Sequence, residues 1–178
     1  SIVSLAIGFA CFAMASMWIK YETTYDAFHK DADRMYCLVN NEGAWTISNQ
    51  YCDSVVKYCH EVEAVTAFTN RYYWDLRQND SLLANIVCTY CDSSFLEMFN
   101  IRILAGTDGF LHNDREVAIN RLTAEKLWPN QNPLGQEFTL DGGTEGSIVP
   151  YTVTAVVDGW DEHSCLHFDL LRNNTSKK

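Results

Sequence analysis

The segment EAVTAFTNRYYWDLRQNDSLLANIVCTYC, residues 63–91, has the clearest strand pattern in the chain. It is rich in β-branched and aromatic residues, which favour extended backbone. Gln78, Asn79 and Asp80 interrupt this pattern and are typical of a turn. We therefore predict two antiparallel strands joined at this turn and expect the hairpin to form part of a larger sheet. An amphipathic helix is predicted before it, at residues 48–59.

Strand and short-helix patterns are mixed, without a regular alternation, in the segments after the hairpin: 92–100, 101–106, 115–140 and 151–160. The first predicts a short capped helix that plugs the core, and the second predicts a strand that ends in glycine. The third predicts a strand, a helix from about Thr123 to Trp128, a turn and another strand, and the fourth alternates like a strand. Because no strand–helix–strand rhythm is present, the predicted fold class is α+β, with a mixed, largely antiparallel sheet and short helices.

The segment before the predicted 48–59 helix combines aromatic and charged residues. Residues 23–39 predict a short amphipathic helical turn that leads into a strand from Met35 to Val39. Tyr25, Phe28 and Ala32 recur at helical spacing, so we expect these three side chains to pack on one side.

An apolar block opens the chain, because residues 2–19 contain no charged side chain. A membrane-spanning helix needs about 20 mostly apolar residues. We therefore predict a transmembrane helix over residues 1–20, followed by one folded domain over residues 21–178. Small residues recur in the block and let another helix approach closely. Trp18 followed by Lys20 suits the boundary between lipid and water.

The apolar block has two other interpretations. A secretory signal peptide would use the small residues at Ala13–Ala15 as its cleavage site, but the apolar run continues to Ile19. A buried core helix would be shorter and would carry a polar stripe. The membrane helix is the interpretation that we favour.

No Gly, Pro or Ser spacer separates the apolar block from the charged, aromatic segment that begins at Tyr21. The helix can therefore continue past the membrane surface into the domain and fix the orientation of that domain. We predict a stiff helix–domain junction formed by five residues: Trp18, Tyr21, Tyr25, Asp26 and Phe28.

The charge of the chain excludes one class of partner. The formal net charge is -10, and no cluster of Lys and Arg interrupts the acidity. Such a chain repels phosphate backbones, so we expect no nucleic acid partner. Anionic lipid headgroups are disfavoured for the same reason.

Seven cysteines raise the question of disulfide, redox or metal chemistry. Cys88 and Cys91 form a CxxC motif, but in an extended strand these two side chains lie on opposite faces. Redox CxxC motifs normally open a helix after a strand. Redox chemistry is therefore disfavoured, while bridges between distant cysteines stay open.

The densest group of candidate ligands is DEHSCLHFD, residues 161–169, where an extended backbone places alternate side chains on one face. His163, Cys165 and His167 are the candidate metal ligands, and Cys165 with a histidine is the candidate nucleophilic pair. The alternative is a loop that enters a strand, which we favour because spacing alone does not fix a ligand geometry. No GxSxG, HExxH or Walker-type loop occurs. We predict no catalytic residue, no cofactor and no metal, and hence no enzyme.

Four blocks in fixed order resemble the MacB-like periplasmic core domain of MacB/FtsX-type ABC transporter permeases, in particular those common in Bacteroidetes. The blocks are SLAIGFACFAMASMWIKYETTYDAFHKDADRMYCLV (4–39), CDSSFLEMFNIRILAGT (91–107), EVAINRLTAEKLWPNQNPLGQEFTLDG (116–142) and YTVTAVVDGWDEHSCLHFDLL (151–171). The first is similar to the family's membrane helix and its YExxYDxFHxxADRxY entry motif.

The resemblance implies that residues 1–20 are the first membrane helix of a permease in the bacterial inner membrane, with the domain on the periplasmic side. It implies a separate cytoplasmic ABC ATPase, a second permease copy, membrane lipids, and a periplasmic adaptor or cargo as partners. The domain would couple ATP hydrolysis to export or mechanotransmission, and residues 167–169 would be structural. Since the family continues into further elements, we expect the chain to lack the start of the helix and the end of the domain.

Two functions from other classes share parts of this pattern. A membrane-anchored sensor domain of a signalling receptor has the same layout of one helix followed by an α+β domain, and it is the alternative function. A secreted metal- or thiol-dependent hydrolase would require His163, Cys165 and His167 to converge with a further ligand or base.

Overall fold

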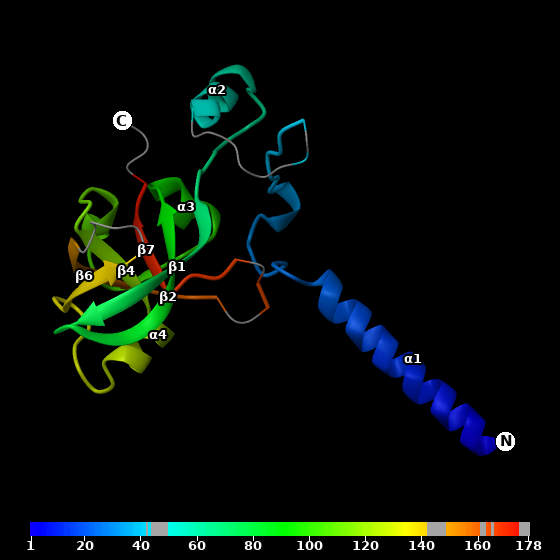
Figure 1. Cartoon of the computed structure of the whole chain (residues 1–178). Coiled ribbons are helices and arrows are strands. Elements are labelled where there is room, and N and C mark those ends of the chain that lie inside the picture. Colours follow the sequence, from blue (N-terminus) through cyan, green and yellow to red (C-terminus); the bar gives the residue numbers. More distant parts are fainter. Residues whose placement is uncertain (42, 44–49, 142–148, 161–162, 165, 175–178) are drawn as a thin grey trace.

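The computed structural model describes residues 1–41, 43, 50–141, 149–160, 163–164 and 166–174. In chain order its elements are α1 (Ile2–Thr23), η1 (Ala32–Arg34), α2 (Gln50–Tyr58), β1 (Thr69–Gln78), β2 (Ser81–Cys91), α3 (Ser93–Met98), β3 (Ile103–Gly106), η2 (Asp108–Leu111), β4 (Glu116–Asn120), α4 (Arg121–Leu127), β5 (Glu137–Asp141), β6 (Val149–Val157) and β7 (Leu170–Asn173). Figure 1 shows the strands gathered into one body, with α1 projecting away from it and α2 standing apart from the sheet.

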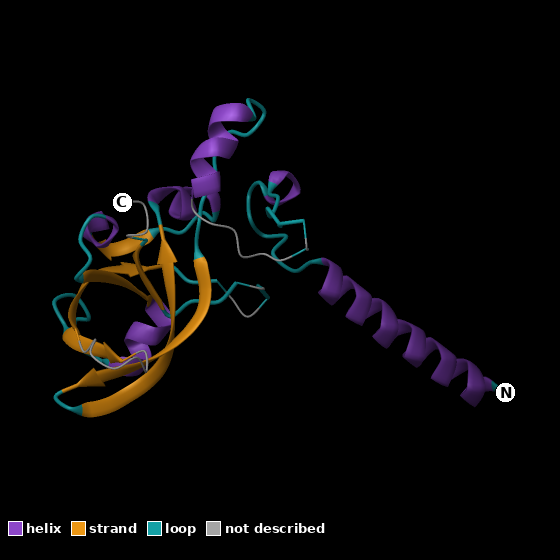
Figure 2. Ribbon diagram, turned by 45° about the horizontal axis from the view of Figure 1, so that its top comes forward, coloured by secondary structure: helices purple, strands orange, loops and turns teal. Residues whose placement is uncertain are grey.

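The sheet closes on itself through β6. Its strand order is β3-β6-β4-β7-β2-β1-β5, and β5 also pairs with β6. β6 pairs with β5 through residues 149–152 and with β3 through residues 155–157, so these two strands share one edge of β6. Figure 2 shows the strands curling around α4. Six strands thus form a ring, and β3 extends it.

The direction of the strands agrees with the predicted fold class. β4 runs parallel to β6, and β2 runs parallel to β7. The other pairings in the described sheet are antiparallel. The expectation of a mixed, largely antiparallel sheet with short helices is therefore confirmed.

The predicted hairpin is present as β1 and β2. Gln78 pairs with Ser81 across a two-residue turn. Asn79 and Asp80, which form the turn, have φ values of 50° and 60°. Two consecutive positive φ angles are the requirement of a type I′ turn, whose twist matches that of the strands. Asn and Asp tolerate this conformation better than most side chains, so the sequence signal and the geometry agree.

Alternation along the strands divides the buried residues into two cores. The inner core lies on the side of the sheet that faces α4, and its larger members are Leu76, Ile86, Val117, Ile119, Trp128, Phe138, Leu140, Tyr151, Val153, Val156 and Leu170. The outer core lies beneath α3 and η2, and it contains Phe95, Ile101, Phe110, Ala118, Val157, Phe168 and Leu171. Both faces of the sheet are therefore buried over its central strands.

The predicted helices follow their sequence signals. Asp92 caps α3, because its Oδ1 accepts a 3.0 Å hydrogen bond from the Phe95 N–H. Phe95 is fully buried as the expected core plug. Asn120 caps α4 in the same way, accepting a 2.8 Å bond from the Leu122 N–H. α2 confirms the helix predicted before the hairpin.

One expectation for a strand is wrong. The segment from Met35 to Val39 forms no strand, because the described sheet offers it no partner, and Tyr36 is 88% exposed. β7 begins at Leu170, directly after residues 161–169, which were expected to form a loop that enters a strand. It is inserted between β2 and β4, where Leu170 enters the inner core and Leu171 the outer core.

Candidate functional site

None of the residues of α1 is buried, and before its last turn the helix projects away from the domain (Figure 1). Its 22 residues span ~33 Å at 1.5 Å per residue, about the thickness of a bilayer core. Apolar residues cover the whole circumference of the helix, and such a helix needs an apolar environment on every side. α1 is therefore a candidate membrane span.

The last turn of α1 meets the loop between β6 and β7 through the ring of His163. The His163 ring centroid lies 4.3 Å from that of Tyr21 and 4.4 Å from that of Tyr25, with interplanar angles of 47° and 42°. The Thr24 hydroxyl oxygen lies 3.0 Å from the His163 Nε2 atom. A hydrogen bond with Tyr21 raises the pKa of Tyr25. Residues at the end of α1 and a residue of the loop between β6 and β7 therefore meet at the His163 ring.

A second set of contacts fixes the backbone directly after α1. The Asp26 N–H donates a 3.3 Å hydrogen bond to the His163 carbonyl, and the Ser164 hydroxyl donates to the Asp26 carboxylate. Ser164 in turn accepts a 3.1 Å bond from the Leu166 N–H. Asp26 has a φ of 56°, so the chain turns sharply here. We call this set the junction clamp: Tyr21, Thr24, Tyr25, Asp26, His163 and Ser164.

His29 anchors the entry segment, which we define as residues 24–34, in an aromatic pocket. It is 5% exposed. Its ring centroid lies 4.3 Å from that of Phe28, 5.2 Å from that of Phe99 and 5.3 Å from that of Trp160. Burial lowers the pKa of His29, against smaller opposing effects of Asp26 and of a hydrogen bond to the Phe99 backbone. The pocket therefore holds a neutral imidazole.

The predicted junction residues are only partly brought together. Tyr21, Tyr25 and Asp26 lie in the junction clamp, and Phe28 contacts the ring of His29 while remaining about half exposed. Trp18 lies earlier on α1 and is 66% exposed.

The expected packing of Tyr25, Phe28 and Ala32 on one side is wrong, because the turn at Asp26 breaks the helical phase. The side chain of this segment that becomes buried on the domain is His29. Because α1 ends at Thr23 and the chain turns at Asp26, no helical spacing in the sequence points to His29.

The predicted metal candidates do not form a cluster within the described residues. His163 belongs to the junction clamp, whereas the His167 Nε2 atom lies 4.0 Å from Asp169 at an exposed position. Cys165 lies outside the described residues. Within the described part of the chain, no group of three or more His, Cys, Asp or Glu side chains could hold a metal.

Cys88 and Cys91 lie on opposite faces of β2, as the strand alternation predicts. Cys88 belongs to the inner core and Cys91 to the outer core. Burial raises the pKa of Cys88 to about 12 and also raises that of Cys91. Both groups are therefore thiols at neutral pH, and a thiol is a poor nucleophile and ligand.

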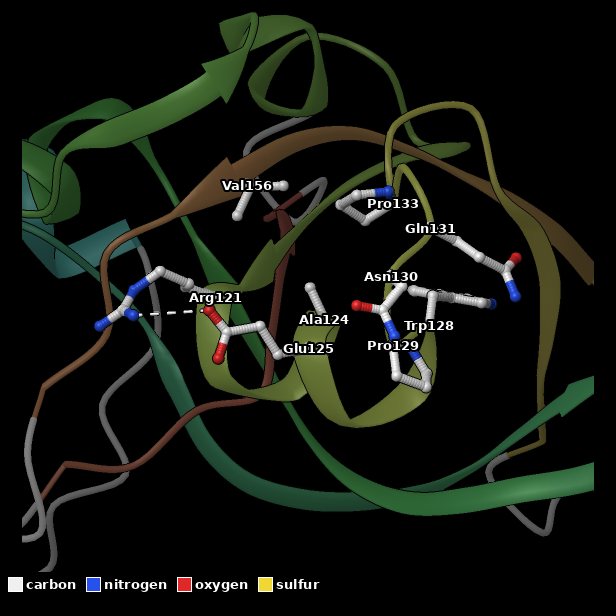
Figure 3. A pocket seen from close by; sticks show the side chains of 9 residues that line it. All are labelled: Arg121, Ala124, Glu125, Trp128, Pro129, Asn130, Gln131, Pro133 and Val156. Atoms are coloured by element: carbon white, nitrogen blue, oxygen red, sulfur yellow. Dashed lines mark hydrogen bonds and ion pairs between the residues drawn. The ribbon is translucent and has the colours of Figure 1, made fainter.

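A shallow pocket of about 380 Å³ lies beside α4 (Figure 3). Trp128, Pro129 and Pro133 supply its apolar wall. Its charged residues, Arg121 and Glu125, pair with each other at 3.5 Å. The remaining lining side chains include no nucleophile or general base. The arrangement is that of a surface groove and not of a catalytic centre.

Residues 1–167 match the family model described as the MacB-like periplasmic core domain. The chain belongs to this family. It is therefore a MacB-like periplasmic domain of the kind found in ABC transporter permeases, as the four sequence blocks indicated. The family match favours the permease over the sensor domain. No curated protein matches the chain.

Solved structures share the fold of this MacB-like domain. A domain of a protein described as a permease from Porphyromonas gingivalis is 19% identical, with a TM-score of 0.59, 68% of this chain covered and 50% of that chain. The periplasmic region of MacB from Actinobacillus actinomycetemcomitans is 14% identical, with a TM-score of 0.56 and coverage of 74% and 56%. The extracellular domain of the noncanonic ABC-type transporter YknZ from Gram-positive bacteria is 18% identical, with a TM-score of 0.56 and coverage of 78% and 70%. The chain thus spans about half the length of the first two.

Proposed function

We propose that the chain provides the first membrane helix and a periplasmic domain of an ABC permease in the bacterial inner membrane, and that it relays ATP-driven movement outward. Family membership supports the general kind of protein. The observation that supports the relay is the junction clamp, which joins the end of α1 to the loop between β6 and β7 through His163 and Ser164.

The position of this loop in the sheet suits a mechanical role. The loop leaves β6, which pairs with β3, β4 and β5, and enters β7, which lies between β2 and β4. A displacement of α1 therefore reaches the strands that hold the ring closed. The buried ring of His29 adds a second attachment, so α1 cannot tilt freely against the domain.

The proposed partners follow from this role. A cytoplasmic ABC ATPase would supply the movement, and a second permease copy would complete the transport unit. Membrane lipids would surround the apolar surface of α1, whose residues are all exposed in the isolated chain. A periplasmic adaptor or cargo would receive the movement. The domain itself carries no catalytic step in this scheme.

The test uses the whole permease with its ATPase in lipid nanodiscs. The clamp variant carries Tyr25→Ala and Asp26→Ala, and the matched control carries Tyr73→Ala and Asp75→Ala on β1, where Tyr73 is exposed. Amide hydrogen exchange of residues 150–173 is measured with and without vanadate trapping of the ATPase. We expect trapping to change exchange in the wild type and the control, and not in the clamp variant, while ATP hydrolysis continues in all three. An equal response in the clamp variant would contradict the relay.

A further inference from the structure

His29 joins three parts of the chain that are distant in sequence. Phe28 lies in the entry segment, Phe99 is the C-cap of α3, and Trp160 follows β6. The rings of Phe99 and Trp160 both meet the imidazole edge to face, at interplanar angles of 75° and 87°. Beyond the junction clamp, which holds residues 24–26, His29 is the buried side chain that docks the rest of the entry segment on the domain.

The surroundings of the ring suit a neutral imidazole better than a charged one. Its Nε2 atom is buried without a hydrogen-bond partner in the described part of the chain. Among the residues that the structure describes, Asp26 is the charged group that contributes to the electrostatics of His29, and its Oδ1 lies 3.8 Å from Nε2. That carboxylate already accepts the Ser164 hydroxyl.

The other elements around the ring contribute aromatic groups and backbone. α3 contributes Phe99 with its backbone hydrogen bond, and the segment after β6 contributes Trp160. Asp161 and Glu162, which follow Trp160, lie outside the described residues. Burial outweighs the favourable effect of Asp26, and the pKa of His29 is lowered as a result.

We propose that His29 is a proton-operated latch: the neutral ring holds the part of the entry segment after Asp26 on the domain, and protonation of the ring releases that part. A released histidine has a pKa of about 6.5. Because the docked pKa is lower, the released form binds more protons below pH 6.5. Docking is therefore complete above that pH and weakens as the pH falls towards the docked pKa. The biological role of the latch rests on the proposed periplasmic location, whereas the docking is a property of the chain.

The latch is tested on the full chain in lipid nanodiscs. Amide hydrogen exchange of residues 26–34 is measured at pH 7.5, 6.5 and 5.5 in the wild type and in His29→Phe, whose ring fills the pocket and cannot be protonated. Dividing the wild-type rate by the His29→Phe rate at each pH removes the intrinsic effect of pH on exchange. We expect this ratio to rise by about 3-fold to 10-fold between pH 7.5 and 5.5.

His112→Phe is the matched control, because His112 lies at an exposed position after η2. The ratio of the exchange rates of residues 26–34 in the wild type and in His112→Phe should not change with pH. If residues 26–34 are not protected from exchange in His29→Phe at pH 7.5, the comparison uses His29→Gln instead, because its side chain is neutral at every pH. A ratio that is independent of pH, or one that falls in acid, would overturn the latch. The relay could fail in the vanadate experiment while the exchange ratio still rises in acid. The two experiments therefore test the relay and the latch separately.

Discussion

Thr123 donates a 2.7 Å hydrogen bond from its hydroxyl to the Asp169 carboxylate and thereby ties α4 to the start of β7. The other carboxylate oxygen accepts a 2.8 Å bond from the Val87 N–H of β2. Asp169 thus joins three elements that meet at one end of the ring. The resemblance implied a structural role for residues 167–169, and these contacts agree with it.

Replacement of Asp169 should destabilise the domain. Hydrogen bonds to a charged group contribute about 1.5–3 kcal/mol each, and their loss leaves a backbone N–H without its acceptor. We expect Asp169→Ala to lower the free energy of unfolding by about 3 kcal/mol in urea titrations. Asp114→Ala, at an exposed position, is the control and should change it by less than about 0.5 kcal/mol. Equal values for the two variants would show that the Asp169 contacts contribute little.

Two glycines with similar backbone angles should respond differently to alanine. Gly106 has a φ of 89° and Gly135 a φ of 83°. A Cβ at Gly106 would lie 2.0 Å from the Thr154 carbonyl oxygen, whereas a Cβ at Gly135 would meet nothing within 4 Å. We expect Gly135→Ala to cost about 1 kcal/mol, the strain of a positive φ. Gly106→Ala should cost about 3 kcal/mol or more, because β3 must move away from β6. Equal denaturation midpoints for Gly106→Ala and Gly135→Ala would argue against the close approach of Gly106 to Thr154.

The cysteines should divide into two classes by reactivity. Cys37 and Cys59 are exposed, whereas Cys88 and Cys91 are completely buried. Because burial raises the pKa of Cys88 to about 12, its thiolate fraction at pH 8 is on the order of 10⁻⁴. Iodoacetamide at pH 8, followed by mass spectrometry, should modify the exposed pair within minutes and the buried pair only after denaturation. Rapid modification of Cys88 in the folded protein would contradict the described packing.

Labelling in cells can test the proposed location. Single-cysteine variants that retain Cys11 or Cys37 are treated with a membrane-impermeant maleimide after the outer membrane is permeabilised. Cys37 follows the entry segment and should be labelled, while Cys11 lies in the middle of α1 and should be shielded by lipid. Labelling of Cys37 only after cell lysis would place the domain in the cytoplasm. Labelling of Cys11 would show that α1 is outside the bilayer.

Local signals in the sequence predicted most of the fold. The hairpin turn at Asn79 and Asp80 and the caps at Asp92 and Asn120 act over a few residues, so composition and spacing reveal them. Closure of the ring could not be predicted in this way. It depends on β6 pairing with three strands, and one strand sequence does not specify its partners.

Only the N-terminal residues of the junction clamp were predicted from the sequence. Tyr21, Tyr25 and Asp26 were expected at the junction because the charged segment follows the apolar block directly. Their contacts His163 and Ser164 lie more than 130 residues further along the chain, and no spacing links positions so distant. His163 was considered as a metal ligand, and its stacking on two tyrosines became apparent only in three dimensions.

The last strand of the described chain occupies the middle of the sheet. β7 pairs with β2 and β4, which are complete by residue 120, yet β7 itself begins at Leu170. A chain that crosses the membrane from its first residues onward would therefore present two unpaired strand edges until residue 173 has emerged. Contacts between residues so distant in sequence form slowly, and unpaired edges promote aggregation. In the proposed topology the domain would therefore complete its assembly only after translocation, and chaperones of the receiving compartment would need to protect β2 and β4 during that interval.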